Sequence, residues 1–408
     1  MVGVAGDKRT FIEAWLERFQ DSSDAHGEEA LIIPDPDLKD MSYTPSPNKR
    51  TRLASGVVDL EATPRRAVAG PSGASTSDVA SGSNSRTTSS SPKKREIALR
   101  LATDFPVRRE HISSMQEPTL LMQDLARLQT ASVIPASMKD LVTKDSKWTN
   151  PPSDSWFYDT PALEDNEHSD KYIYQRLKVI QRKTIQCMRR FEHEAGWNDS
   201  VHSSLLELAL DDERYPGVSY RNVTKCRTYP ELRGPDPFLV DARADYAMIL
   251  EPPENSKLAM SLFRYRQLNL NCHLVAHIQL SDEASTPVAI GIETKSSTSH
   301  SIMGSAQLAT WLRAQFRHLE SLPNHESQGL PIIPVILVQG ATWRVDFAQR
   351  TENRTFIWEG FNIGSSDEIH GCYRIYAGLL RLARWCREEF WPWWEQALAV
   401  PQSQLPPT

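Results

Sequence analysis

Three charged side chains stand at the ends of two short apolar segments of the chain. Glu293 and Lys295 close the alternating segment 287–295, and residues two apart on a strand point to the same face. Asp245 lies near the start of a second apolar segment, 244–250. If these two strands pair, Asp245 and Glu293 can converge on one divalent ion, with Lys295 beside it.

Such a group suits hydrolysis by a metal-activated water. Mg²⁺ binds a few carboxylate oxygens, keeps several waters and lets a substrate phosphate complete its coordination. The ion lowers the pKa of a bound water, and Lys295 can position that water or stabilise the charge that develops on phosphorus. The backbone carbonyl of Thr294 is a further candidate metal ligand. Mg²⁺, or Mn²⁺ in its place, is therefore the expected cofactor.

Each of these residues also has an interpretation without chemistry. Asp245 can bind backbone amides at the start of a strand, and nearby Asp241 is a rival for its role. Glu293 and Lys295 can form an exposed ion pair, which adds little to stability. His202 is more simply a structural residue. Facing carboxylates of Asp245 and Glu293 would favour catalysis, whereas burial of Lys295 in an ion pair away from any cleft would favour an inert protein.

The elements that position these side chains follow from changes in hydrophobic period along the chain. Apolar residues recur at helical spacing in the segments 171–195, 201–210, 303–322 and 373–398. Segments with the character of strands lie at 244–250, 274–280, 287–295, 331–339 and 355–363. The order helix, three strands, helix, strand predicts an α/β fold in which helices flank a mixed central β-sheet.

An Asp on one strand followed by Glu-x-Lys on a later strand resembles the PD-(D/E)XK nuclease superfamily. More narrowly, the chain is similar to the fungal PD-(D/E)XK nuclease-like domain proteins. The segments that carry this likeness are EHEAGWNDSVHSSLLELAL, ADYAMIL, VAIGIETK, AQLATWLRAQ and GCYRIYAGLLRLARW. The resemblance covers most of the chain, and it implies a restriction-endonuclease-like core of α-β-β-β-α-β order.

The resemblance also implies roles for individual residues. Asp245 and Glu293 correspond to the metal ligands, and Lys295 corresponds to the catalytic lysine. Glu194, on the helix before the sheet, resembles the additional acidic residue of many members. Gln307, on the helix after the Glu-x-Lys strand, resembles a supporting glutamine of related nucleases. Glu194 and Gln307 can equally be ordinary residues of a helix surface.

Composition divides the chain into regions. Residues 1–20 form a short amphipathic helix by pattern. Residues 21–95 are expected to be a disordered linker, because a Ser- and Pro-rich basic sequence cannot offset chain entropy by burial. A helical connector over 96–134 precedes the nuclease-like domain at 135–400, and 401–408 is a tail.

Charge and apolar content bear on partners and location. The net charge of −6 argues against a protein that coats nucleic acid without specificity. The basic clusters at 49–52 (KRTR) and 93–95 (KKR) suit nuclear import, with plain solvated charge as the alternative. Without import the protein is expected to be cytoplasmic. No apolar run approaches the roughly 20 residues that span a membrane, so no membrane partner is expected.

Two functions agree with these features. The leading hypothesis is a metal-dependent nuclease that hydrolyses phosphodiester bonds in DNA or RNA. The alternative is a catalytically inactive protein of nuclease fold that acts in the nucleus as a nucleic-acid-binding or protein-interaction module, because fold does not fix function. Metal-dependent cleavage separates the two.

Overall fold

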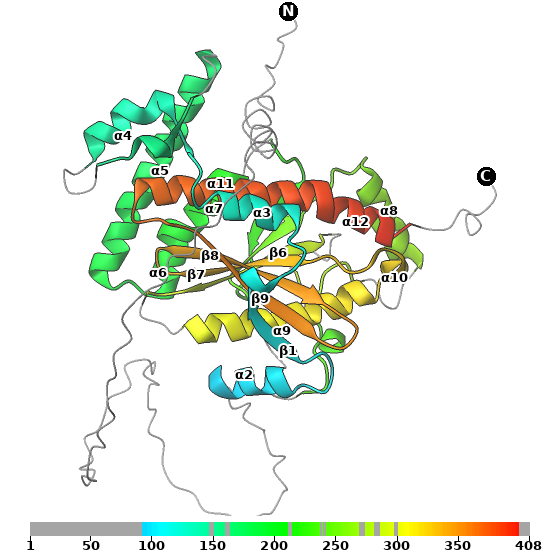
Figure 1. Cartoon of the computed structure of the whole chain (residues 1–408). Helices are drawn as coiled ribbons and strands as arrows, with labels where there is room; N and C mark the ends of the chain where they lie inside the picture. The colour runs from blue at the N-terminus through cyan, green and yellow to red at the C-terminus, as the bar shows by residue number, and fades with distance from the viewer. Residues whose placement is uncertain are drawn as a thin grey trace, which may run out of the picture. The chain divides into compact units, whose positions relative to one another are not determined.

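A seven-stranded mixed sheet forms the centre of the structure (Figure 1). The computed structural model describes residues 92–146, 151–159, 164–210, 214–236, 239, 242–268, 274–280, 286–297 and 301–399. The strands follow one another across the sheet in the order β1-β9-β8-β7-β6-β5-β4. Their bounds are β1 (Val107–His111), β4 (Val218–Asn222), β5 (Tyr246–Leu250), β6 (Val288–Lys295), β7 (Ile333–Gln339), β8 (Thr342–Arg350) and β9 (Thr355–Ser365). A separate pair consists of β2 (Ile134–Pro135) and β3 (Phe157–Tyr158).

The strand direction changes next to β6. This strand runs parallel to β7 and antiparallel to β5. A parallel pair needs a crossover connection, and the helix α9 (Ser301–Glu320) provides it. All eight residues of β6 are buried, as is usual for a strand covered on both faces. The strand that carries Glu293 and Lys295 is therefore an interior strand of the sheet.

Helices cover both faces of the sheet. Figure 1 shows α11 and α3 on one face and α9 with α2 on the other. The helix α9 packs on β6, and α11 packs on β9. The remaining helices are α2 (Pro92–Leu101), α3 (Leu120–Arg127), α4 (Lys139–Asp145), α5 (Glu164–Arg190), α6 (Glu194–Trp197), α7 (Ser203–Leu210), α8 (Lys257–Leu268), α10 (His325–Gln328), α11 (Ile369–Trp385) and α12 (Trp391–Ala397). A π-helical turn, η5 (Asn198–His202), joins α6 to α7.

Two glycines allow α9 to lie close to the sheet. A Cβ on Gly291 of β6 would lie 2.8 Å from Nε1 of the buried Trp311. A Cβ on Gly304 of α9 would lie 2.6 Å from Leu337 Cδ1 and 3.2 Å from Glu293 Cγ. Because neither glycine has a side chain, the helix can rest directly over the strand that bears Glu293.

The α/β class with a mixed, helix-flanked sheet is confirmed, as are the strands expected near 244–250, 287–295, 331–339 and 355–363. The strand expected at 274–280 is wrong. That segment makes one isolated bridge, between Ile278 and Thr228. Its apolar residues Ala276 and Ile278 are buried in the core beside Trp311 instead.

Three strands that the sequence did not indicate, β1, β4 and β8, complete the sheet. β4 is a strand at the sheet edge whose side chains are mostly half-buried, so its sequence VSYRN lacks a clear apolar face. β8 includes the buried Asp346, which pairs with Arg344. With β4 in place of 274–280, three strands lie between α7 and α9, although α8 stands between β5 and β6.

The structure describes the chain from residue 92 onward, so only part of the expected N-terminal regions can be compared with it. The helix expected at 1–20, most of the linker expected at 21–95 and the tail at 401–408 lie outside the described residues. Residues 92–95 begin α2, so the linker does not extend to 95. The connector at 96–134 contains β1 as well as helices, and β1 pairs with β9 in the main sheet. The domain start at 135 stays a prediction.

The C-terminal end of α5 has an uncommon backbone conformation. Phe191 follows the helix with a φ of 51°, in a position where glycine is the usual residue. The Glu192 N–H donates to the Cys187 carbonyl and the Phe191 N–H donates to the Met188 carbonyl, the bonds of a Schellman motif. The Phe191 ring is 77% exposed, so burial does not offset the strain of this conformation.

Within the described ranges, every helix is either too short or too polar to cross a membrane. The long helix α5 has four basic residues, Arg176, Lys178, Arg182 and Lys183, well inside its length. The most apolar stretches of the chain are strands of the central sheet, such as β7.

Candidate active site

The two strands expected to carry the acidic residues are neighbours. β5 and β6 pair antiparallel, with Tyr246 opposite Ile292. Continuing this register by one residue places Asp245 opposite Glu293, and directly opposed residues share one face of a sheet. The Asp245 N–H donates to the Ile292 carbonyl at 3.0 Å, which holds the backbone of Asp245 against β6.

Thr294 holds the side chain of Asp245. The oxygen Oδ2 of Asp245 accepts hydrogen bonds from the Thr294 N–H and from Thr294 Oγ1, both at 2.8 Å. Thr294 lies between Glu293 and Lys295 in β6. The tripeptide Glu293-Thr294-Lys295 thus supplies two charged groups and orients the third.

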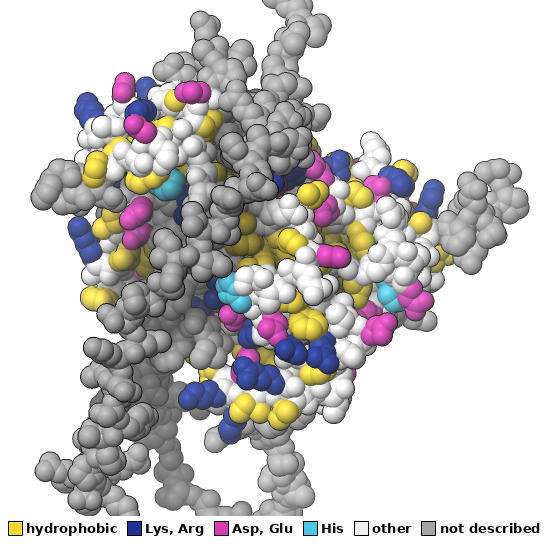
Figure 2. All heavy atoms as spheres, viewed as in Figure 1, with side chains coloured by type: hydrophobic (Ala, Val, Ile, Leu, Met, Phe, Trp, Pro, Cys, Tyr) yellow, Lys and Arg dark blue, Asp and Glu magenta, His cyan; other side chains and the backbone are white. Residues whose placement is uncertain are grey.

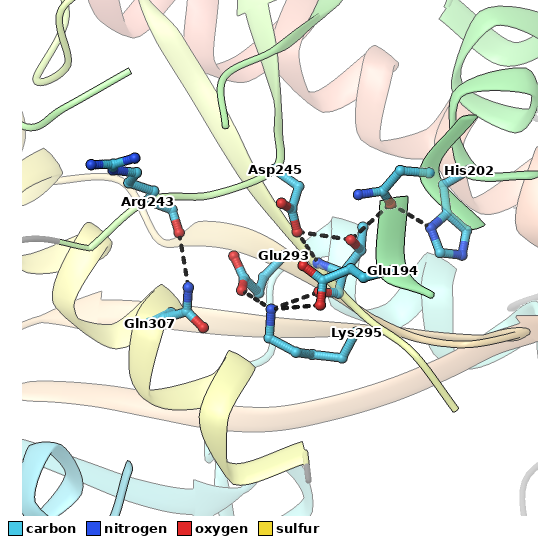
Figure 3. A network of polar contacts seen from close by, with 9 residues as sticks. Glu194, His202, Arg243, Asp245, Glu293, Lys295 and Gln307 are labelled. Carbon is cyan, nitrogen blue, oxygen red and sulfur yellow. Dashed lines mark hydrogen bonds and ion pairs between the residues drawn. The ribbon is translucent and has the colours of Figure 1, made fainter. Parts of the chain in front are cut away.

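The ammonium of Lys295 lies among oxygen atoms. Its Nζ is 2.6 Å from Glu293 Oε1, 3.2 Å from Glu194 Oε2 and 2.8 Å from the Thr294 carbonyl oxygen. Figure 3 shows the carboxylates of Asp245, Glu293 and Glu194 gathered around this ammonium. Glu194 comes from the first residue of α6. The site therefore joins residues from α6, β6 and the approach to β5.

Burial and like charge shift the protonation of these acids. Burial, and after it the charge of Asp245, raises the pKa of Glu293 to about 8. Burial also raises the pKa of Glu194, against the attraction of Lys295. Burial alone would lower the pKa of Lys295, but the charge of Glu293, with those of Glu194 and Asp245, outweighs burial and raises it. Lys295 therefore stays positively charged, and Glu293 readily holds a proton.

The acids include oxygen atoms that lack a full set of partners. Oε1 of Glu293 meets the ammonium of Lys295 at 2.6 Å, whereas Oε2 has no hydrogen-bond partner within the described residues. The side chain of Glu293 is only 1% exposed, and a buried polar atom without a partner is costly. A hard divalent ion would supply that partner, so the donor set fits Mg²⁺ or Mn²⁺.

The candidate metal site offers only a few protein ligands. Among the residues that the structure describes, no three His, Cys, Asp or Glu side chains stand where together they could hold an ion. Asp245 and Glu293 would contribute two carboxylates, and the Thr294 carbonyl a third oxygen. Mg²⁺ is commonly bound by one or two carboxylates while water and phosphate complete its coordination.

A comparison with protein families now bears on this geometry. The family model of the PD-(D/E)XK nuclease superfamily matches residues 142–391, which is more than half of the chain and includes Asp245, Glu293 and Lys295. The chain belongs to the PD-(D/E)XK nuclease superfamily. No curated protein and no solved structure matches it. The narrower likeness to fungal members of the superfamily stays a prediction.

Glu194 and Gln307, the two supporting residues expected from the PD-(D/E)XK resemblance, differ from each other in their position at the site. Glu194 reaches the site through Lys295, although its side chain is 38% exposed. Gln307 points at the backbone, where its Nε2 is 3.5 Å from the Arg243 carbonyl (Figure 3). Gln307 has no contact with the three acids, so it supports the segment before Asp245. The catalytic roles of both residues stay predictions.

Two residues near the PD-(D/E)XK motif were not expected to take part. Asn198 lies 2.8 Å from Thr294 Oγ1, and His202 lies 2.9 Å from Asn198. His202, interpreted from sequence as structural, is fully buried. The spacing Asn-x-x-x-His directly after Glu194 is the sequence pattern that could have indicated them. The rival Asp241 lies outside the described residues.

Proposed function

We propose that this chain is a metal-dependent nuclease that hydrolyses phosphodiester bonds of DNA or RNA. In this proposal Asp245, Glu293 and the Thr294 carbonyl bind Mg²⁺ or Mn²⁺, and Lys295 assists catalysis. The observation that carries it is the carboxylate of Glu293, which is 1% exposed, feels the charge of Asp245 and has one oxygen, Oε2, without a hydrogen-bond partner among the described residues. Membership of the nuclease superfamily supports a nucleic-acid substrate.

The protein groups have distinct tasks in this reaction. A bound Mg²⁺ or Mn²⁺ would act as a Lewis acid and make a bound water more acidic. Lys295 remains charged because the surrounding acids raise its pKa, so its ammonium can stabilise negative charge on a substrate phosphate. Glu194, near Lys295 but partly exposed, holds the ammonium within reach of the site.

Lys295 and a divalent ion share the same oxygen atoms. The ammonium contacts Glu293 and the Thr294 carbonyl, which are also two of the proposed metal ligands. With an ion bound there, Glu293 would hold Lys295 less tightly, and the Lys295 ammonium would be available for a phosphate oxygen.

The proposal is tested by cleavage of DNA and RNA by the purified protein, with Mg²⁺, with Mn²⁺ and with a chelator. We expect metal-dependent cleavage that falls about 100-fold or more in Asp245→Asn and Lys295→Ala, because each removes a group that stabilises charge in the transition state. Lys257→Ala is the matched control, since Lys257 is 72% exposed and pairs with Glu395 away from the site. Equal residual cleavage by all these proteins would reject the nuclease proposal.

A second candidate is an inactive protein of the same fold that binds nucleic acid or another protein in the nucleus. The contacts of Lys295 favour it, because the ammonium already lies 2.6 Å from Glu293 and 3.2 Å from Glu194. Retained nucleic-acid binding without Mn²⁺ binding or cleavage would support this candidate over the nuclease.

Nuclear import is part of both proposals. Of the two basic clusters, 93–95 lies in the first turn of α2, where Lys93 and Lys94 are exposed. Figure 2 shows Lys and Arg side chains gathered at the lower part of the face in view, near α2 and β1, with acidic side chains among them. Arg100 and Arg109 pair with Glu96 there. Fluorescence microscopy of the protein with either cluster changed to alanine tests which one directs import, and unchanged nuclear signal in both would reject it.

A further inference from the structure

A series of four hydrogen bonds runs from the turn after β7 to the carboxylate of Asp245, and Figure 3 shows the part of it from His202 to Asp245. His202 Nε2 lies 2.9 Å from the Gly340 carbonyl oxygen, and His202 Nδ1 lies 2.9 Å from the Asn198 amide. The same amide atom, placed as Oδ1, lies 2.8 Å from Thr294 Oγ1. Thr294 Oγ1 in turn lies 2.8 Å from Asp245 Oδ2.

Both ends of the series can only accept hydrogen bonds. The Gly340 carbonyl has no hydrogen to give, so His202 Nε2 must carry a proton and donate it. The ionised Asp245 carboxylate likewise only accepts, so the single hydroxyl hydrogen of Thr294 is directed to Oδ2. The direction of the series is thereby fixed from both sides.

The middle of the series follows from these ends. Burial lowers the pKa of His202 to about 4, so near neutral pH its imidazole has one proton, at Nε2, and Nδ1 accepts. The Thr294 hydroxyl donates its only hydrogen to Asp245 Oδ2, so it can only accept a hydrogen bond from Asn198. The amide atom of Asn198 that faces both must therefore be its nitrogen, whose two hydrogens serve both partners. Amide nitrogen and oxygen are assigned from such bonds, because their shapes are nearly the same.

We propose that Asn198 and His202 are positioning residues for Asp245. Their hydrogen bonds direct the Thr294 hydroxyl to Oδ2 and leave Oδ1 for a divalent cation, since Oδ1 has no hydrogen-bond partner among the described residues. The inference rests on the proposed function, because it treats Asp245 as a metal ligand. Groups that hold a metal ligand in place change metal affinity by roughly 10–100-fold.

The local structure keeps the two positioning residues fixed. Asn198 and His202 begin and end the π-helical turn η5, a form of helix that often occurs at functional sites. The imidazole stacks on Trp197, with ring centres 5.8 Å apart, and meets the edge of Trp343 at 5.7 Å. The Tyr246 hydroxyl donates to the Asn198 carbonyl at 3.1 Å, which ties the turn to β5.

The direction of the series is tested by nuclear magnetic resonance of the histidine side chains in ¹⁵N-labelled full-length protein near neutral pH. We expect His202, identified by its absence from His202→Phe, to be protonated at Nε2 and unprotonated at Nδ1. In Asn198→Asp, which keeps the shape and removes both amide donors, we expect Nδ1 to gain a proton. A proton on Nδ1 in the unaltered protein, or no change in Asn198→Asp, would overturn the assignment.

The consequence for the cation is tested by calorimetric titration with Mn²⁺. We expect His202→Phe and Asn198→Asp to bind Mn²⁺ about tenfold or more weakly than the unaltered protein. His318→Phe is the matched control, because His318 is equally buried and bonds the Leu274 carbonyl through Nε2 but lies outside the series. Equal Mn²⁺ affinity in both histidine variants would overturn the positioning role. Absence of Mn²⁺ binding in the unaltered protein would reject the proposed function instead, while the resonance result still decides whether the series exists.

Discussion

The carboxyl group of Glu293 sets how the metal-free protein responds to pH. Burial, followed by the charge of Asp245, raises its pKa from 4.5 to about 8. Between these values the folded chain keeps a proton that the unfolded chain has released, so stability falls as the pH rises through about 8. A divalent ion reverses this preference, because it binds the ionised carboxylate.

We expect Glu293→Gln to remove most of this pH dependence. In the presence of a chelator, the free energy of unfolding of the unaltered protein should fall between pH values of about 4.5 and 8, while that of the variant stays flatter. Urea unfolding at several pH values measures both. The exposed Glu254→Gln is the control, and parallel curves for Glu293→Gln and the unaltered protein would contradict the prediction.

The hydroxyl of Thr294 is a second determinant at the scale of single residues. Thr294→Val removes the hydrogen bond to Asp245 and leaves the Asn198 amide without an acceptor. Unmade hydrogen bonds of buried groups cost about 1–3 kcal/mol, so we expect the free energy of unfolding to fall by that amount. Thr294→Ser keeps the hydroxyl and should lose less. An equal loss in the two variants would show that the methyl group, and not the hydroxyl, is responsible.

The charged residues of the candidate site could be predicted from the sequence, whereas the residues that orient them could not. Asp245, Glu293 and Lys295 stand out because charge at the end of an apolar strand is rare. Asn198 and the Thr294 side chain contribute through hydrogen bonds that depend on the register of a π-helical turn against β6. Periodicity does not reveal a π-helical turn, so beyond the Asn-x-x-x-His spacing after Glu194 the sequence does not indicate these contacts.

At the scale of elements, the end of α5 combines strain with exposure. Phe191 has a φ of 51° and an exposed ring, and a residue with a Cβ pays roughly 1–2 kcal/mol for such a conformation. We expect the free energy of unfolding of Phe191→Gly to be about 1 kcal/mol higher than that of Phe191→Ala. Both variants lose the ring, but only glycine relieves the backbone. Urea unfolding measures the difference, and an alanine variant as stable as the glycine variant would refute it.

Elements with a strong apolar pattern were predicted well, and elements with mixed patterns were not. β6 and β7 are continuous apolar strands buried in the sheet. The segment 274–280 is as apolar as a strand, yet it is buried as a loop against Trp311. β4 was missed because it lies at the sheet edge and most of its side chains are only half-buried. Burial alone therefore does not distinguish a strand from a buried loop.

At the scale of the whole molecule, the compact unit extends upstream of the domain start that composition suggested. Residues 89–408 form one unit by their contacts. Leu99 of α2 and Val107 of β1 are buried in it, and Asp104 pairs with Arg313 of α9. These contacts give the segment before residue 116 a structural role.

We expect a chain that begins at residue 116 to be less stable than one that begins at residue 89 by at least about 3 kcal/mol. The reason is the loss of buried Leu99 and Val107, each worth about 1.5–3 kcal/mol. Thermal unfolding of the two shortened proteins measures the difference. Equal melting temperatures would favour the later start, at 135, that the sequence suggested.

The pairing of β1 with β9 has a consequence for synthesis of the protein. Val107 of β1 lies beside Thr355 of β9, and ribosomes add about 5–20 residues per second. The strand β1 therefore leaves the ribosome roughly 10 to 50 s before β9, its neighbour in the described sheet, exists. During that interval its amide and carbonyl groups are open to other partners, and nascent chains of this protein should depend on chaperones until the ninth strand emerges.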